Sequence, residues 1–246
     1  MLDPRERLIV ALDVSSTAAA QKIVAAVGDS ALTYKVGMQL YTAEGPRAVR
    51  DLVASGRRVF LDLKYHDIPT TVSAAVREAA GLGVSMLTVH ASGGGKMLHA
   101  ASEAARAVNP TLWLLAVTVL TSMDDAALET VGVRSRMVDQ VLRLAALSIA
   151  EGCRGIVASA LEASELRREF GEAIAIVTPG VRPAGSSHGD QARVVTPADA
   201  IAAGATHIVV GRPITAAADP GAEARAILRQ IQDSQALSPS FTPATL

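Results

Sequence analysis

Three ionisable residues stand close together directly after a short apolar run. Residues 59–61 are apolar, and the segment 62–69 that follows reads DLKYHDIP and contains Asp62, Lys64 and Asp67. Side chains alternate between the two faces of a strand, so we expect Asp62 and Lys64 on the same face. A carboxylate beside an ammonium group can repel one anionic group of a ligand and donate a proton to another centre.

Polar residues also mark the ends of other apolar runs. Asp13 closes the first run, Lys35 lies inside the second and Thr121 ends the fifth. The structural alternative is two ion pairs, Asp62 with Lys64 and Asp13 with Lys35. Buried ion pairs are weak evidence for stability, because desolvation of each ion costs several kcal/mol. Four ionisable groups on three neighbouring strand ends exceed what a fold needs, and we interpret them as a reactive array.

The rest of the chain supplies the elements that position these residues. β-branched runs alternate with Ala-rich stretches whose apolar residues recur at three and four. The runs predict eight strands, at residues 8–13, 33–37, 58–64, 86–91, 114–121, 155–160, 175–180 and 207–214. The stretches between them predict helices, among them 17–27, 69–83, 136–152 and 197–205. Pro69 suits a first helical turn, and Gly83, Gly152 and Gly204 suit helix ends.

Eight strands with intervening helices predict an α/β protein, a single-domain (β/α)8 TIM barrel over residues 1–235. A doubly wound open sheet is the alternative for the same alternation. The barrel is favoured because 246 residues fit its usual size and GxGxxG is missing from the first strand–helix turn. Residues 236–246 have two prolines and no periodicity, which predicts a loose C-terminal tail.

Composition excludes several classes of protein. Half of the residues are hydrophobic and 19% are charged, which is typical of a globular chain with a large core. A formal net charge of −1 with scattered basic residues argues against nucleic acid as a partner. The single cysteine, Cys153, allows no intrachain disulfide, and we find no HxH, HExxH or three-carboxylate cluster for a metal. The short apolar run at 8–13 lacks the length of a signal or membrane segment, so we expect a cytoplasmic protein without a membrane partner.

The loops after the last two predicted strands combine glycine with arginine. They read TPGVRP (178–183) and VVGRPI (209–214). Glycine lets backbone N–H groups approach a ligand, arginine binds phosphate, and these loops are the usual phosphate site of such a barrel. Ordinary turns with solvated arginines are the alternative, but the presence of both motifs favours phosphate.

Three other features have weaker interpretations. GGGK (93–96) lacks the GxxxxGK spacing of a P-loop and is interpreted as a flexible turn into the next helix. His66 is a poorer candidate for chemistry than its neighbour Asp67. His90 either lines the site or caps a strand.

In their order along the chain, these motifs resemble the orotidine 5′-phosphate decarboxylase family. The resemblance covers nearly the whole chain, through ALD (11–13), YKVG (34–37), DLKYHDIPTTV (62–72), VTVLTS (117–122), TPGVRP (178–183) and VVGRPI (209–214). It implies a homodimeric carboxy-lyase of de novo pyrimidine biosynthesis that makes uridine 5′-phosphate from orotidine 5′-phosphate. It also implies that no metal and no organic cofactor is required.

The resemblance further implies a role for each residue. Lys64 would donate a proton to C6 of the pyrimidine, and Asp62 would lie beside the departing carboxylate. Lys35 would complete an alternating Asp and Lys network and contact the ribose, Asp13 would bind a ribose hydroxyl, and Asp67 would reach the partner's site across the dimer interface.

The remaining implied residues bind substrate or lie near the interface. Ile68 and Thr71 are expected near the interface. Thr121 is expected at the pyrimidine edge, with Ser122 as the alternative. The phosphate-side residues are Arg182, Gln191, Gly211 and Arg212. None of these positions departs from the family's pattern.

Two rival functions remain open. Enzymes acting on keto-sugar phosphates share the barrel and a similar DxKxxD block, but those with an enediolate intermediate need magnesium. Arg212 in GRPI and the GVRP loop with Gln191 favour the nucleotide substrate, and independence from chelators would discriminate. A non-catalytic nucleotide or sugar-phosphate sensor is the other rival. The presence of Lys64 and of both carboxylates in its block argues against it.

Overall fold

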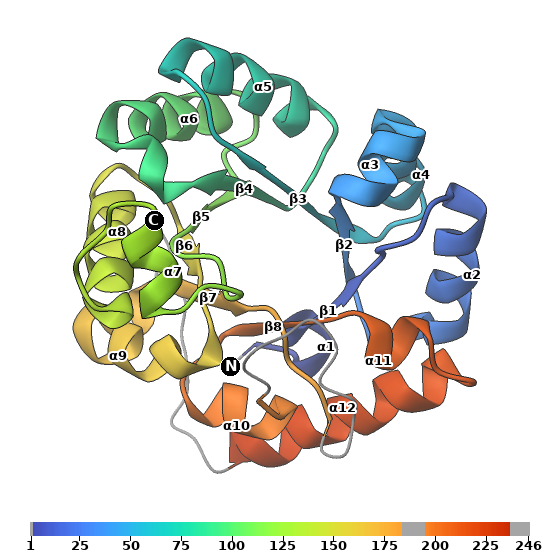
Figure 1. The fold of residues 1–246 in the computed structure, drawn as a ribbon. Coiled ribbons are helices and arrows are strands. Elements are labelled where there is room, and N and C mark those ends of the chain that lie inside the picture. Colours follow the sequence, from blue (N-terminus) through green and yellow to red (C-terminus); the bar gives the residue numbers. More distant parts are fainter. Residues whose placement is uncertain (1, 184–194, 237–246) are drawn as a thin grey trace.

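The computed structural model describes residues 2–183 and 195–236, and these form a closed barrel of eight parallel strands in the order β1 to β8. Helices surround the barrel on its outside (Figure 1). The predicted (β/α)8 fold is confirmed, and the open-sheet alternative is wrong because β8 pairs with β1. Gln191 and the tail beyond residue 236 lie outside the described residues.

The elements follow one another in regular alternation. The strands are β1 Leu8–Ala11, β2 Thr33–Gly37, β3 Arg58–Tyr65, β4 Met86–His90, β5 Trp113–Val117, β6 Gly155–Val157, β7 Ala175–Thr178 and β8 His207–Val210. The helices are α1 Pro4–Arg7, α2 Thr17–Val27, α3 Met38–Glu44, α4 Pro46–Ala54, α5 Pro69–Gly81, α6 Gly95–Val108, α7 Asp125–Thr130, α8 Met137–Ala150, α9 Ala160–Phe170, α10 Pro197–Ala202, α11 Arg212–Thr215 and α12 Pro220–Ala236. Short 3-10 turns lie at η1 Gly28–Ser30, η2 Ala91–Gly93 and η3 Gly171–Ala173. In the described part of the chain, no helix is long and apolar enough to cross a membrane.

Helix signals in the sequence located the helices well. α2 has its predicted bounds, and Pro69 is the first residue of α5. Gly83, Gly152 and Gly204 have positive φ angles of 79°, 91° and 105°, as expected for glycines that end helices. The GGGK segment forms the end of η2 and the start of α6 rather than a P-loop.

Six of the predicted strands extend too far at their C-terminal ends, whereas β2 ends where predicted and β3 continues one residue further, to Tyr65. β1 ends at Ala11, two residues before Asp13, and β5 ends at Val117, four residues before Thr121. The backbone leaves the ladder at these points. After β8, for example, the Gly211 carbonyl accepts hydrogen bonds from the N–H groups of Ile214 and Thr215, where α11 forms. Asp13 and Thr121 therefore lie in loops at the open end of the barrel, not in strands.

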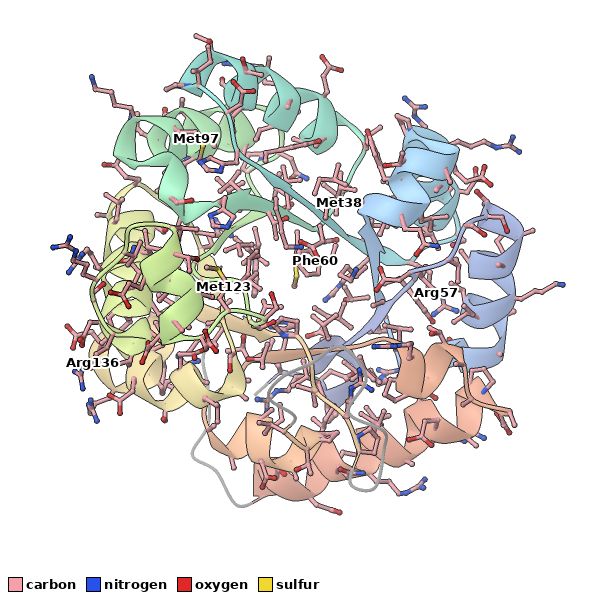
Figure 2. All side chains as sticks on the ribbon, in the orientation of Figure 1. Met38, Arg57, Phe60, Met97, Met123 and Arg136 are labelled. Atoms are coloured by element: carbon pink, nitrogen blue, oxygen red, sulfur yellow. The ribbon has the colours of Figure 1, made fainter. Side chains whose placement is uncertain are left out.

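Two hydrophobic layers hold the barrel together. One fills its interior and is made of Ile9, Ala11, Phe60, Met86, Leu115, Val117, Val157, Ala175, Val177 and Val209. Figure 2 shows Phe60 projecting into the middle of the barrel. The other layer lies between strands and helices and includes Leu8, Val10, Leu61 and Leu87. Alternation along each strand thus sends every second residue inward, so a polar residue at an inward position near a strand end faces the mouth.

Candidate active site

The end of β3 is bulged, and the bulge contains Lys64. Residues 61 and 65 of β3 pair with residues 87 and 89 of β4, so β3 has more residues than β4 between the same two pairs. Within residues 2–183 and 195–236, Lys64 is the one non-glycine residue with a positive φ, at 52°. Bulges commonly re-aim side chains next to active sites. Here the Lys64 side chain reaches Asp62, two residues earlier in β3.

Four side chains form an alternating chain of acids and bases at the mouth. Lys35 Nζ lies 2.7 Å from Asp13 Oδ1 and 4.0 Å from Asp62 Oδ2. Lys64 Nζ donates to both carboxylate oxygens of Asp62, at 2.9 Å each. The predicted proximity of Asp62 and Lys64 is therefore confirmed, and the array comes from β2, β3 and the loop after β1.

Burial within this array is graded. The side chains of Lys35 and Asp62 are 11% and 14% exposed, whereas that of Lys64 is 27% exposed and that of Asp13 is 54% exposed. Charges in a partly water-excluded site interact more strongly than they would in water. Two of the three N–H groups of Lys64 bond to Asp62, so the ammonium is oriented at the edge where a ligand would enter.

Gly37 is a residue of the site that sequence reasoning missed. A Cβ atom added there would lie 2.8 Å from Lys35 Nζ and 3.0 Å from Asp13 Oδ1. Gly37 lies two residues after Lys35 in β2 and so shares its face. The strand TYKVG contained this signal, because a glycine beside an inward lysine leaves room for its partner. Thr88, on β4, was also missed, and its bonds are described below.

Three predicted residues lie apart from the array in this chain. Asp67, in the β3–α5 loop, is exposed, and its Oδ1 accepts a bond from the Ile68 N–H (2.6 Å). Ile68 is 64% exposed and Thr71 is exposed. In the described part of the chain, Asp67 makes no ion pair with Lys35 or Lys64.

The phosphate-side candidates lie in the loops after β7 and β8. A Cβ atom at Gly211 would lie 4.0 Å from Asp13 Oδ2, so the β8 loop adjoins the acid at the end of β1. Arg212 begins α11 and is exposed, whereas Arg182 is buried. Gln191 falls outside the described residues. Thr121 lies half-buried in the loop after β5.

His90 lies at the rim of the array, at the end of β4. Its ring stacks on that of His66, with centroids 5.3 Å apart, and its Nδ1 lies 2.7 Å from Ser92 Oγ. Burial, together with the nearby charges of His66 and Lys64, lowers the pKa of His90. The ring is therefore neutral at neutral pH and packs beside the site.

Comparison with known proteins identifies the family. The model of the orotidine 5′-phosphate decarboxylase / HUMPS family matches residues 6–227. The chain belongs to this family.

Individual relatives agree with this membership. An orotidine 5′-phosphate decarboxylase of Halorhodospira halophila is 52% identical over 92% of this chain and 95% of its own length. One of Moorella thermoacetica is 50% identical over 93% of each chain. A crystal structure of orotidine 5′-phosphate decarboxylase from Lactobacillus acidophilus superposes with a TM-score of 0.82 at 39% identity, covering 92% of this chain and 99% of that chain. This member of the orotidine 5′-phosphate decarboxylase / HUMPS family is an enzyme, a decarboxylase of the carboxy-lyase class.

Proposed function

We propose that this enzyme decarboxylates orotidine 5′-phosphate to uridine 5′-phosphate in de novo pyrimidine biosynthesis, with Lys64 as the proton donor and without a metal or an organic cofactor. The observation that carries the proposal is the Asp13–Lys35–Asp62–Lys64 array at the mouth of the barrel. Its residue types, order and spacing suit a reaction that leaves a carbanion and needs a proton.

In the proposed reaction, the bond between C6 and the carboxylate carbon breaks. The electron pair remains on C6 and CO₂ departs. No adjacent carbonyl delocalises that charge well, so the Lys64 ammonium stabilises it directly and then gives its proton to C6. Lys64 regains a proton from water when the product has left. The ammonium supplies the positive charge, so the step requires no Lewis acid.

Asp62 has two roles in this proposal. It accepts two hydrogen bonds from Lys64 Nζ and so orients the proton donor. It also faces the substrate carboxylate, and their repulsion is relieved when CO₂ leaves. Lys35 lies between Asp13 and Asp62 and moderates the repulsion between these two acids.

The rest of the substrate binds around the array. Asp13 and Lys35 contact the ribose, and Thr121 contacts the pyrimidine edge. The phosphate is bound by Arg182, Gln191, Gly211 and Arg212.

Only four of the 23 basic residues are lysines, yet the array uses two of them. Arginine suits phosphate because its planar fork binds two oxygens and keeps its charge, whereas lysine can deliver a proton.

We further propose that the enzyme is a homodimer in which Asp67 reaches the partner's site. In this chain Asp67, Ile68 and Thr71 are exposed, and Ile68 is a large apolar side chain. A second exposed apolar side chain, Met38 (58% exposed), begins α3 directly after β2 (Figure 2). Covering these residues in a two-fold dimer would bury apolar surface and add a carboxylate to each site. The expected location is the cytoplasm, with no nucleic acid or membrane partner.

The test follows the absorbance of orotidine 5′-phosphate in the presence of EDTA. The wild type should consume it, and Lys64→Ala should not. Lys96→Ala, which removes an exposed lysine of α6, serves as the matched control and should keep wild-type activity. Consumption that requires added magnesium, or none by the wild type, would sink the proposal. Keto-sugar phosphates with magnesium would then be the substrates to try.

A further inference from the structure

The Thr88 side chain links Asp62 and Lys64, two residues of the bulged end of β3. It lies on β4 opposite the bulge and is fully buried, with 0% exposure. Its Oγ1 accepts a hydrogen bond from the Lys64 backbone N–H (2.9 Å) and donates one to Asp62 Oδ1 (3.0 Å). One hydroxyl thus binds the main chain of one site residue and the side chain of the other.

The bond to the backbone acts where the chain is strained. A non-glycine residue in the left-handed region is strained and persists only where its surroundings hold it. The Lys64 N–H has left the regular β3–β4 ladder, and the Thr88 hydroxyl supplies the acceptor that β4 backbone would otherwise provide. Without that acceptor, a partly buried N–H group would lose its partner.

The bond to Asp62 orients the carboxylate that pairs with Lys64. Asp62 Oδ1 accepts from both Thr88 Oγ1 and Lys64 Nζ, and its Oδ2 accepts from Lys64 Nζ. Donors on two sides hold the plane of the carboxylate in one orientation. The Lys64 Nζ position therefore depends on Thr88 twice, through its own backbone and through Asp62.

We infer that Thr88 is a positioning residue that sets the place of the Lys64 ammonium, an inference that rests on the proposed function for its effect on catalysis. Thr88 need not touch the substrate. Removing its hydroxyl leaves Lys64 and Asp62 present but frees the backbone and the carboxylate to turn. Proton delivery would suffer more than substrate binding, because small displacements of a catalytic group reduce rate steeply.

The experiment compares Thr88→Val with Thr88→Ser. Valine has the shape of threonine without the hydroxyl, and serine restores the hydroxyl. Thr88→Val should lower kcat by about 10- to 100-fold, as expected for a lost hydrogen bond to a charged group, with KM changed less than about threefold. Thr88→Ser should recover most of the loss. If Thr88→Val does not fold, Thr88→Cys takes its place, since a thiol is a much weaker hydrogen-bonding group.

A matched control is available on the neighbouring strand. Thr118 directly follows β5, is also buried and donates its hydroxyl to the Val157 carbonyl (3.3 Å). Thr118→Val makes the same change near the same end of the barrel without touching the array, and should leave kcat unchanged. An equal loss in both valine variants, or no loss in Thr88→Val, would overturn the inference. So would a serine variant as impaired as the valine variant.

A second measurement does not depend on turnover. The chain has four lysines, Lys22, Lys35, Lys64 and Lys96, so its ¹⁵N-lysine Nζ spectrum is simple, and the Lys64→Ala variant assigns the Lys64 signal. Thr88→Val should shift or broaden the Lys64 Nζ signal, and Thr118→Val should not. If the wild type fails to decarboxylate orotidine 5′-phosphate, the proposed function fails while this spectrum still tests the bridge. An unchanged Lys64 signal in Thr88→Val would refute the bridge even in an active enzyme.

Discussion

At the C-terminal end of the barrel, two lysines and two aspartates contact one another around an open mouth, whereas at the N-terminal end the protein encloses His207 and bonds Arg7 to backbone carbonyls. His207 begins β8, is 3% exposed and meets Trp113 edge to face, with ring centroids 5.6 Å apart. Its Nδ1 lies 2.9 Å from Thr206 Oγ1. Arg7, at the end of α1, donates to the carbonyls of Ala205 (2.6 Å) and Thr206 (2.9 Å).

The two ends differ in whether the protein favours the neutral or the charged state of their ionisable side chains. Burial, with the nearby charges of Arg7 and Arg58, lowers the pKa of His207 to about 3, so this ring stays neutral. At the mouth, each ammonium instead lies within hydrogen-bonding distance of a carboxylate. The closed end should therefore affect stability, and the open end should affect chemistry, as is usual for this fold.

The largest expected effect is at the open end and involves two chains. Lys64→Ala and Asp67→Ala should each be nearly inactive, with a loss in kcat of at least about 10⁴-fold for Lys64→Ala. If Asp67 serves the partner's site, a mixed dimer of the two variants contains one site with both residues intact. Mixing the variants after dissociation should then restore roughly a quarter of wild-type activity, because half the dimers are mixed and each has one good site.

Activity and sedimentation of the mixture check this expectation. Each variant alone, taken through the same dissociation and mixing, is the control. A mixture that stays inactive although mixed dimers form would show that Asp67 does not act across the interface. The mouth would then be complete within one chain, like the closed end.

The contrast between the ends was partly visible in the sequence. Alternation placed Asp62 and Lys64 on one face. The strand pattern also indicated which polar residues point inward. The ends of the strands could not be located in this way. Val119 and Leu120 continue the apolar run of β5, but the strand itself ends at Val117.

The bulge was also hidden. LDLKY alternates regularly, and nothing in it signals that a lysine would take a positive φ of 52°. The pairing of β3 with β4 decides that conformation, and pairing is a property of two segments more than 20 residues apart, as Lys64 and Thr88 are (|i−j| of 24). Thr88 accordingly looked like one more residue of an apolar strand, and Asp67 remains a prediction because its proposed contact lies on another chain.

The next effect concerns the closed end and pH. The pKa of His207 is about 3 in the folded state and about 6.5 in the unfolded chain. Above pH 6.5 both states are neutral there, and the contribution to stability is fully present. Between pH 6.5 and 3 the unfolded chain binds a proton that the folded state does not, so stability falls by about 1.4 kcal/mol per pH unit from this group.

His207→Gln removes this titration. The free energy of unfolding, measured by urea denaturation between pH 7 and 4, should fall less steeply in the variant than in the wild type. His99→Gln, which changes an exposed histidine near Glu151, is the control and should keep the wild-type slope. Equal slopes in the wild type and His207→Gln would show that the ring is protonated inside the fold, which contradicts the contrast between the two ends.

The smallest expected effect concerns a change at the closed end that should alter stability without altering catalysis at the open end. Arg7→Met keeps the apolar stem but removes the donors to Ala205 and Thr206, and leaves two partly buried carbonyls without these bonds. Stability should fall by about 1–3 kcal/mol, while kcat and KM stay within about twofold of wild type. Arg136→Met removes an arginine on the outer surface (Figure 2) that pairs with Asp139, and should leave stability close to that of the wild type. A drop in kcat for folded Arg7→Met would mean that the two ends are coupled through the barrel. An unchanged stability would mean that water replaces the guanidinium without cost.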